Sequence, residues 1–202
     1  MIYVVRHGQT VWNAAGRFQG HLDSPLTRAG ERQAADMGRA LARLVDSRCE
    51  PLAAHVSPLG RARRTAALAA EHIPLDLIGE PRLAEVNMGA WDGLTLDEID
   101  AEFPGALART DRLGWFFCGP GGETFDALRA RVSSWLGDLD DRPVAAFTHG
   151  VTSRVIRGVY LGLSRREMLA QATPQDGLYI LSDGRAEFVD ARSDDDVRIE
   201  RQ

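Results

Sequence analysis

The fold is decided by residues 2–13, which run Ile2-Tyr3-Val4-Val5-Arg6-His7-Gly8-Gln9-Thr10-Val11-Trp12-Asn13. Their apolar, β-branched start predicts a short buried strand. Arg6 and His7 then stand at the carboxyl end of that strand, which is the edge of an open α/β sheet where ligands bind. Gly8 lets the backbone turn sharply, or lets a ligand approach it closely. The stretch therefore combines the N–H donors of Arg6, which could bind an oxyanion, with a possible nucleophile in His7 and with room for a ligand at Gly8.

The same arrangement recurs late in the chain. Residues 144–147 are apolar and predict a second buried strand, which ends in Thr148-His149-Gly150. A helix is expected to follow over about 151–161. Because the carboxyl ends of parallel strands meet at one edge of a sheet, His7 and His149 could meet over a single ligand.

The sequence between these two motifs alternates helix and strand signals. In chain order we expect a helix capped by Thr27, a strand over 52–56, a helix opening at Ser57-Pro58, a strand over 75–78, a long ordered loop over 82–93, a short helix with a capping box from Thr95 to Glu98, an amphipathic helix over 125–139, and a hairpin turning at Asp183-Gly184. The charged tail after Asp190 is expected to fray.

This alternation predicts a three-layer α/β/α fold with a mostly parallel central sheet. One domain is expected over residues 1–202, with a small cap formed by an insertion at about 104–122. The insertion contains the aromatic run Trp115-Phe116-Phe117, which either packs in the core or forms a wall of the site.

The composition excludes several classes of protein. The 202 residues carry a net charge of −5, which argues against a general nucleic-acid-binding role. Two cysteines, Cys49 and Cys118, give neither a disulfide framework nor metal-ligand spacing. No apolar stretch is long enough to cross a bilayer, and Met1 leads straight into the first strand without a signal peptide. We therefore expect a cytoplasmic protein with no membrane or nucleic-acid partner.

The paired histidines fit phosphoryl transfer. A neutral imidazole of His7 would attack phosphorus and form a phosphohistidine, since the ordinary histidine pKa is near ~6.5. Arg6 and Arg61 would grip the phosphoryl oxygens, and His149 would stabilise charge as the group transfers. Helix N-termini after Gly8, Ser57 and Gly150 would aim free N–H groups at the anion.

Glu85 is the candidate acid and base of this chemistry. It would protonate the leaving alkoxide and later take a proton from water, which requires a raised pKa. Arginines and histidines already supply positive charge, so we expect no metal and no cofactor. The expected partner is a small-molecule phosphate ester.

At these residues the chain resembles the histidine phosphatase superfamily, the phosphoglycerate-mutase-like proteins, from Ile2 to about Val189. The matching blocks are Arg6-His7-Gly8, Asn13, Gly16-Arg17-Phe18-Gln19-Gly20 with Asp23-Ser24-Pro25-Leu26-Thr27, Ser57-Pro58-Leu59-Gly60-Arg61-Ala62, Leu83 to Gly93 with Glu85, and Thr148-His149-Gly150. The resemblance places the nucleophile on His7, the second phosphate arginine on Arg61 and the acid/base on Glu85. It adds Asn13 to the phosphate pocket, with Gln19 and Gly150 as further candidate phosphate contacts.

Departures from the family pattern favour its phosphatase branch. The similar mutases have extra chain after the glutamate block, whereas here Trp91-Asp92-Gly93-Leu94-Thr95 runs directly into a helix. Gly121-Gly122-Glu123-Thr124 also resembles a stretch of that branch. Nothing is carried over to Pro174-Gln175-Asp176-Gly177, where the family often has a different polar segment.

Several alternatives stay open. Arg61 could belong to a solvated face with Arg63 and Arg64; Glu85 could only pair with an arginine; Asn13 and Gln19 could only satisfy loop backbone. Glu123 could cap the following helix instead of contacting substrate. A phosphoglycerate mutase would share every catalytic residue, and a non-catalytic relative could bind phosphorylated ligands. Dimers are common among similar proteins, so a homodimer also stays open.

Overall fold

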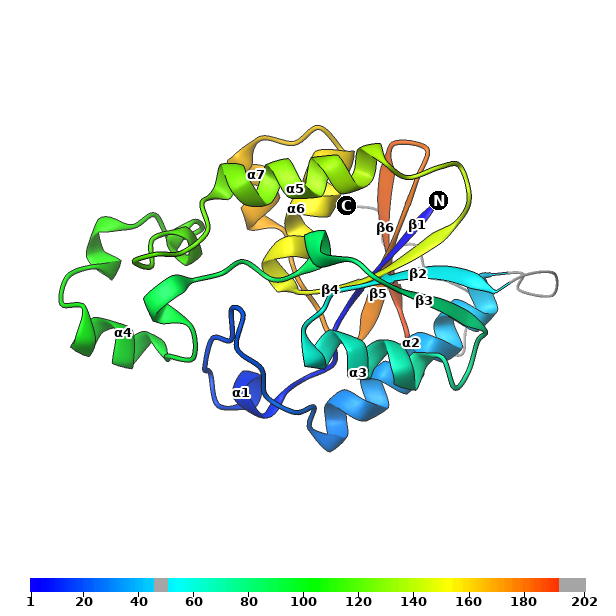
Figure 1. Cartoon of the computed structure of the whole chain (residues 1–202), viewed down its shortest axis with the longest axis horizontal. Helices are drawn as coiled ribbons and strands as arrows, with labels where there is room; N and C mark the ends of the chain where they lie inside the picture. The colour runs from blue at the N-terminus through cyan, green and yellow to red at the C-terminus, as the bar shows by residue number, and fades with distance from the viewer. Residues whose placement is uncertain (46–50, 193–202) are drawn as a thin grey trace.

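Strand β1 (Ile2–Arg6) lies inside a six-stranded sheet, between β4 (Val144–Thr148) and β5 (Gly177–Ser182). The structure is a computed structural model that describes residues 1–45 and 51–192 (Figure 1). The remaining elements are α1 (Val11–Ala14), α2 (Arg28–Leu44), β2 (Leu52–Val56), α3 (Gly60–Ala69), β3 (Leu75–Gly79), α4 (Leu96–Glu102), α5 (Phe125–Gly137), α6 (Gly150–Tyr160), α7 (Arg165–Ala170) and β6 (Arg185–Asp190).

The strands follow the order β3-β2-β4-β1-β5-β6. β1, β2, β3 and β4 are parallel to one another, whereas β5 pairs antiparallel with both β1 and β6. The predicted mostly parallel sheet is therefore confirmed, and so is the hairpin, whose turn places Asp183 at φ 48° and Gly184 at φ 70°. Parallel pairing of Arg6 with Thr148 puts the two histidine motifs at the same sheet edge.

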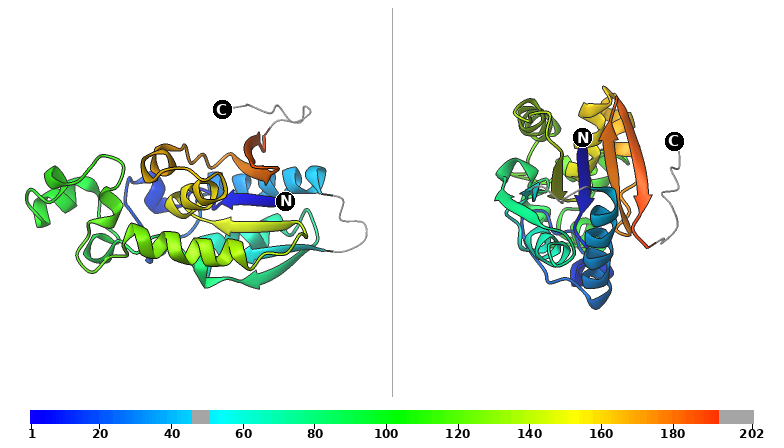
Figure 2. Two further views of the ribbon diagram at one scale, coloured as in Figure 1. Left: turned by 90° about the horizontal axis from the view of Figure 1, so that it is seen from above. Right: turned by 90° about the vertical axis from the view of Figure 1, so that its right-hand side faces the viewer.

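Successive residues of β1 face opposite layers because side chains alternate along a strand. Ile2 and Val4 pack in one hydrophobic core with α5 and α6, and Tyr3 and Val5 pack in a second core with α2 and α3. Figure 2 shows these helices on the two faces of the sheet. The predicted three-layer α/β/α fold is confirmed.

The start of α3 differs from the sequence prediction. The helix begins at Gly60 with Leu59 as N-cap, whereas the Ser57-Pro58 pair was the expected start. Ser57 is instead completely buried, and its hydroxyl lies 2.7 Å from His149 Nε2. A tertiary contact therefore outweighs the local capping signal at this serine.

A helix was expected after Gly8, and the structure has one there, the four-residue helix α1 (Val11–Ala14). Its N-cap Thr10 accepts a hydrogen bond from Asn13 N at 3.0 Å, and Thr10 N donates to Asn13 Oδ1 at 3.2 Å. This reciprocal capping box stabilises a single turn that is too short to show helical periodicity. It also fixes the side chain of Asn13 beside the site.

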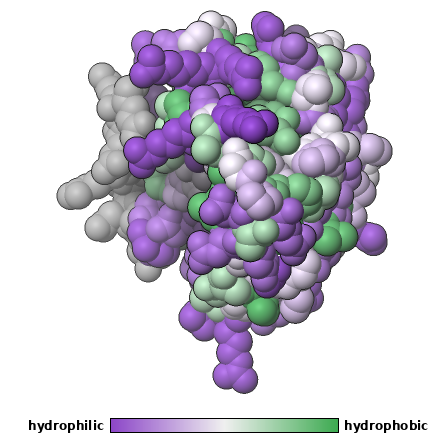
Figure 3. All heavy atoms as spheres, turned by 90° about the vertical axis from the view of Figure 1, so that its left-hand side faces the viewer, coloured by the Kyte–Doolittle hydropathy of each residue, from purple (hydrophilic) through white to green (hydrophobic). Residues whose placement is uncertain are grey.

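The segment 104–122 lies with α4 at one end of the molecule, beyond the sheet (Figure 1). Trp115 stacks edge-on against Phe18, with ring centroids 4.6 Å apart, and lies 4.4 Å from the Phe116 ring. The aromatic run therefore packs against the core, as one alternative predicted, while Phe116 also lines the cavity described below. The face at this end mixes hydrophilic and hydrophobic side chains (Figure 3).

Two features of the sequence prediction lie outside the described residues: Cys49, and the charged tail over 193–202. Within the described part of the chain, no helix has the length and apolar character needed to span a membrane.

Candidate active site

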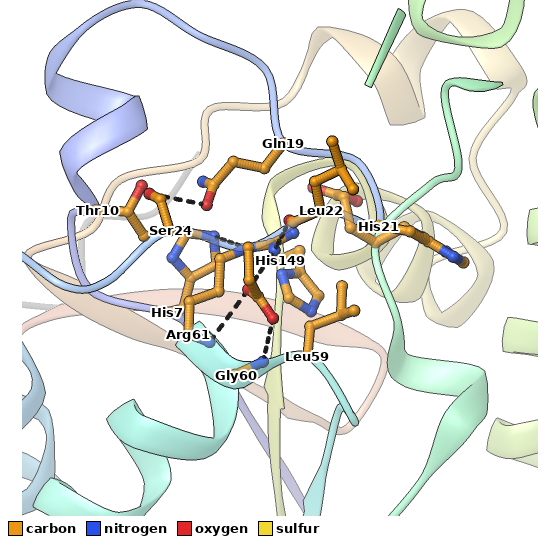
Figure 4. Close-up of polar contacts among 12 residues, drawn as sticks. His7, Thr10, Gln19, His21, Leu22, Ser24, Leu59, Gly60, Arg61 and His149 are labelled. Atoms are coloured by element: carbon orange, nitrogen blue, oxygen red, sulfur yellow. Dashed lines mark hydrogen bonds and ion pairs between the residues drawn. The ribbon is translucent and has the colours of Figure 1, made fainter. Parts of the chain in front are cut away.

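His7 and His149 come together at the carboxyl edge of the sheet. His7 N donates to Thr148 O at 3.0 Å, which ties the loop after β1 to the end of β4. The two imidazole centroids lie 5.2 Å apart, and the residues are 3% and 0% exposed. Figure 4 shows Arg61 gathered with both histidines. The structure thus brings His7, His149 and Arg61 together at one place, as the predicted phosphoryl transfer requires.

One nitrogen of His7 is held ready as a lone-pair donor. His7 Nδ1 lies 2.8 Å from Gly8 O, a carbonyl that can only accept, so Nδ1 carries the proton. Nε2 then has the lone pair, and Arg61 Nε donates to it at 3.3 Å. Burial, reinforced by the charges of Arg6 and Arg61, lowers the pKa of His7 well below its usual value. The lowered pKa favours the neutral imidazole that the predicted phosphohistidine chemistry requires.

His149 is held by Ser57. The Ser57 hydroxyl accepts from Leu59 N at 3.3 Å and lies within hydrogen-bond distance, 2.7 Å, of His149 Nε2. His149 Nδ1 is buried and has no hydrogen-bond partner among the described residues. Burial first, then the charge of Arg61, lowers the pKa of His149 well below its usual value. The Nδ1 atom is therefore a buried polar group available to a ligand.

Arg6 also has an unpaired buried donor. Its Nη1 donates to the carbonyl of Thr173, while its Nε is buried without a partner among the described residues. Burial lowers the pKa of Arg6 to about 10, against a raising effect of the Glu85 charge, so the guanidinium remains charged at neutral pH. Arg6 is therefore a fixed cation with an N–H group available for a ligand.

Arg61 makes more hydrogen bonds to other protein groups than the sequence predicted. Besides its contact with His7, its Nη1 donates to Leu22 O and Asp23 Oδ1, and its Nη2 donates to Gly20 O, each at 2.8 Å. It is 2% exposed, so the alternative of a solvated face is wrong. Arg61 holds the loop over 20–23 against His7, and one N–H of Nη2 remains for an anion.

Glu85 lies at the N-terminus of α6. Its Oε2 accepts from Val151 N at 3.1 Å, and its Oε1 accepts from Thr152 N at 3.1 Å and from its own neighbour, Val86 N, at 3.0 Å. The carboxylate caps a helix whose N-cap residue, His149, offers no side-chain hydrogen bond. Among the described residues, Glu85 forms no ion pair with an arginine. These residues therefore give no support to the alternative that Glu85 only pairs with an arginine.

The N–H groups at the helix N-termini were predicted to face the anion, but in the structure protein side chains accept hydrogen bonds from most of them. Besides the α6 donors taken by Glu85, the N-terminal N–H groups of Gly60 and Arg61 donate to Asp23, and α1 is capped by Thr10. Most of these backbone donors are therefore occupied. The positive charge at the site comes from arginine side chains instead.

The remaining predicted residues border the same space. Asn13 Oδ1 accepts from the loop backbone at Thr10 N at 3.2 Å, as the alternative proposed, and also from Gln175 Nε2 at 3.1 Å. Gln19 Oε1 accepts instead from a side chain, Ser24 Oγ, at 3.4 Å. Gly150 lies beside Arg6, where a Cβ would make only ordinary contact at 3.6 Å.

Glu123 stands directly before Thr124, the N-cap of α5, and does not line the cavity described below. It forms an ion pair with Arg131 at 2.7 Å, and Thr124 caps α5. Arg131 in turn donates to the carbonyl of Glu85 at 3.2 Å, and His21 Nε2 contacts the same carbonyl at 2.9 Å. Glu123 therefore acts on the backbone of Glu85 through Arg131.

Three residues at the site were missed by the sequence reasoning: Thr173, Gln175 and Arg154. Gln175 Nε2 donates to the carbonyl of His7 at 3.0 Å, and Thr173 accepts from Arg6. Both lie in the segment before β5 that departs from the family pattern, so no motif marked them. Arg154 falls one turn after His149-Gly150 in the sequence, and that spacing was the available signal.

The site opens into a cavity of about 450 Å³. All of the predicted site residues except His149 line it, and further walls come from Phe18, Met88, Phe116, Arg154 and Thr173. No group of three or more His, Cys, Asp or Glu side chains suited to a metal ion occurs in residues 1–45 and 51–192.

A family model for the histidine phosphatase superfamily, branch 1, matches residues 2–191. The chain therefore belongs to the histidine phosphatase superfamily. It is 35% identical over 179 residues to a probable phosphoglycerate mutase GpmB of Photorhabdus laumondii, covering 80% of this chain and 75% of the relative. A relative with the same description from Escherichia coli is 35% identical over 171 residues, with the same coverage.

Two solved structures illustrate the proteins whose folds are similar to that of this chain. The protein of reading frame Rv3214 from Mycobacterium tuberculosis superposes with a TM-score of 0.74 at 26% identity, covering 93% of this chain and 94% of that one. A mycobacterial glucosyl-3-phosphoglycerate phosphatase superposes with a TM-score of 0.72 at 29% identity, covering 93% and 96%. The relatives thus carry both mutase and phosphatase descriptions.

Proposed function

We propose that this protein is a phosphomonoester phosphatase that acts through a phosphohistidine on His7. The observation that carries the proposal is His7 Nε2, whose lone pair lies beside the Arg61 guanidinium while Gly8 O holds the other ring nitrogen. Two buried nitrogens of the same cluster, Arg6 Nε and His149 Nδ1, have no partner among the described residues. This arrangement suits a phosphoryl group with several oxygens to be bound.

The reaction has two balanced steps. His7 Nε2 attacks phosphorus, a P–N bond forms, and the P–O bond to the alcohol breaks as protonated Glu85 gives its proton to the leaving oxygen. Water then attacks phosphorus, Glu85 takes its proton, the P–N bond breaks, and inorganic phosphate leaves. Arg6, Arg61 and His149 stabilise the phosphoryl charge in both steps.

A phosphoglycerate mutase is the second candidate, because the relatives from Photorhabdus laumondii and Escherichia coli carry that description. In that reaction a second hydroxyl would take the phosphoryl group from His7 in place of water. The absence of extra chain after the glutamate block, where Gly93 is followed directly by α4, favours the phosphatase. The glucosyl-3-phosphoglycerate phosphatase shows that a close structural relative carries a phosphatase description.

The test compares phosphate release from p-nitrophenyl phosphate by the wild type and by His7→Ala. We expect turnover by the wild type, inhibition by vanadate, no loss with EDTA, and a decrease of about three orders of magnitude or more in His7→Ala. 3-Phosphoglycerate supplied with bisphosphoglycerate separates the two reactions. Rapid isomerisation without phosphate release would establish the mutase, and tight phosphate binding with no turnover at pH 4 to 8 would establish a binding protein.

A further inference from the structure

Gln175 contacts two residues of the site without lining the cavity itself. Its side-chain nitrogen Nε2 donates to the carbonyl of His7 at 3.0 Å and to Asn13 Oδ1 at 3.1 Å. His7 and Asn13 line the cavity, whereas Gln175 does not. Any effect of this glutamine on a ligand in the cavity therefore passes through the two residues that it holds.

Main-chain partners determine which atom of each amide is oxygen and which is nitrogen. A carbonyl can only accept a hydrogen bond, so the Gln175 atom beside His7 O is the nitrogen. A backbone N–H can only donate, so the Asn13 atom 3.2 Å from Thr10 N is the oxygen. The contact between the two amides then runs from the Gln175 nitrogen to the Asn13 oxygen, in agreement with both assignments.

Asn13 is left with its amide nitrogen for a ligand. Its oxygen accepts from both Thr10 N and Gln175 Nε2, whereas its Nδ2 has no hydrogen-bond partner among the described residues. The side chain is half-buried at the wall of the cavity. The oxygens of a phosphoryl dianion only accept, so the Asn13 nitrogen can donate to them, whereas the Asn13 oxygen would repel them.

The segment that carries Gln175 is anchored on both sides. Three consecutive carbonyls before it each accept a hydrogen bond from a different arginine: Gln171 O from Arg154 Nε at 2.8 Å, Ala172 O from Arg157 Nη2 at 2.7 Å, and Thr173 O from Arg6 Nη1. After it, Asp176 O accepts from Ala191 N at 2.9 Å. The Gln175 side chain therefore extends from backbone that is held in place.

We propose that Gln175 is a positioning residue of the phosphoryl site, which orients the Asn13 amide so that Nδ2 is offered to a phosphoryl oxygen. The same nitrogen of Gln175 holds the carbonyl of His7, so one side chain ties this phosphate donor to the nucleophile. The inference rests on the proposed function, because it assumes that a phosphoryl group occupies the cavity.

The test is a double-mutant cycle measured by calorimetry with orthovanadate, a tetrahedral oxyanion whose binding needs no turnover. Asn13→Ala should weaken vanadate binding about tenfold, because one donor to a charged ligand is lost. Gln175→Met keeps the length of the side chain but has no donor, so we expect a loss of similar size. In the double variant the second substitution should add less than about a twofold loss, because both remove the same contact. A general loosening of the segment would not disappear when Asn13 is already absent.

Gln171→Met is the matched control. Gln171 belongs to the same segment, and its Nε2 donates to Arg154 O and to Met168 O, each at 3.0 Å, so it holds neither Asn13 nor His7. This variant should bind vanadate as the wild type does. Gln175→Ala should behave as Gln175→Met does, so the result does not depend on how methionine packs.

Unchanged binding in Gln175→Met would overturn the inference, and so would losses in the two single variants that multiply in the double variant. A wild type that binds no vanadate would overturn it as well. If the wild type binds vanadate but releases no phosphate from any ester, the proposed function fails, and the cycle still decides whether Gln175 acts through Asn13.

Discussion

The Ser57 hydroxyl is the one hydrogen-bond partner of the His149 side chain among the described residues. Leu59 N donates to the same hydroxyl and holds it in place. The serine thus fixes the orientation of the His149 ring. It is a positioning residue, since it acts through the imidazole.

We predict that Ser57→Ala lowers kcat about tenfold, because a buried imidazole loses its hydrogen-bond partner and its fixed orientation. Ser57→Thr, which keeps the hydroxyl, should recover most of the activity. The matched control is Ser153→Ala, a serine of α6 that is 2% exposed and whose hydroxyl makes no recorded contact with the catalytic groups. Equal losses in Ser57→Ala and Ser153→Ala, or no rescue by threonine, would contradict the positioning role.

At the residue scale, the sequence was sufficient to predict the candidate site residues that stand at the carboxyl ends of strands. Arg6, His7 and His149 stand directly after apolar runs, so their meeting followed from parallel pairing. Thr173 and Gln175 could not be found in this way. They contact Arg6 and His7 from a segment more than 160 residues away, through a path of the chain that no local pattern encodes.

At the scale of elements, α2 and the loop after β1 meet through two glycines. Gly8 was expected to make room for a turn or a ligand, but a Cβ there would lie 2.2 Å from the carbonyl oxygen of Gly30. A Cβ on Gly30 would in turn lie 2.0 Å from the carbonyl oxygen of Gln9. The helix N-terminus thus packs directly on the backbone that carries His7, and the glycines allow that contact.

We predict that Gly30→Ala destabilises the protein by about 3 kcal/mol, because backbone on both sides must move to admit one methyl group. Gly137→Ala is the matched control: it lies at the end of α5 with nothing within 4 Å of its Cβ position. That variant should gain roughly 0.5 kcal/mol or more from helix propensity. Urea unfolding measures both changes, and equal stability of the two variants would refute the contact.

Element boundaries show why local signals succeed or fail. Thr27 caps α2 and Thr95 caps α4 as predicted, because Thr27 Oγ1 accepts from Gly30 N and Thr95 Oγ1 accepts from Glu98 N. Ser57 has the same local signal but a stronger partner in His149, so α3 begins later. A local stretch of sequence does not show that a distant residue will compete for a capping side chain.

For the whole molecule, the buried histidines couple stability to pH. Burial is the first cause that lowers the pKa of His7, His149 and the less buried His55. Below the ordinary histidine pKa of about 6.5, the unfolded chain binds protons that the folded histidines do not take. Stability must therefore fall as pH falls through this range.

We predict that the free energy of unfolding decreases from pH 7 to pH 5, by up to about 1.4 kcal/mol per pH unit for each fully buried histidine. Urea titrations across this range measure the slope. Replacing His7 or His149 by asparagine should reduce it. A free energy that stays constant, or that rises as the solution becomes more acidic, would show that these imidazoles can accept protons in the native protein.

The overall architecture was predictable because periodicity and strand ends agree along most of the chain. Alternating strand and helix signals gave the three layers, and Asp183-Gly184 gave the hairpin. The order of strands was not accessible in the same way. It depends on which apolar edges pair across the sheet, and several orders satisfy the same pattern of elements.

The central position of β1 has a consequence for how the protein folds. Ile2 pairs with Val144 on one side and with Leu181 on the other, so its partners lie at least about 140 residues along the chain. β1, which precedes His7, can pair with β4 and β5 only after the chain has closed a very long loop. Its entry into the sheet is therefore a late and slow step of folding. Until then its apolar edges remain unsatisfied and prone to mispairing, so catalytic competence should be the last property to return after dilution from denaturant.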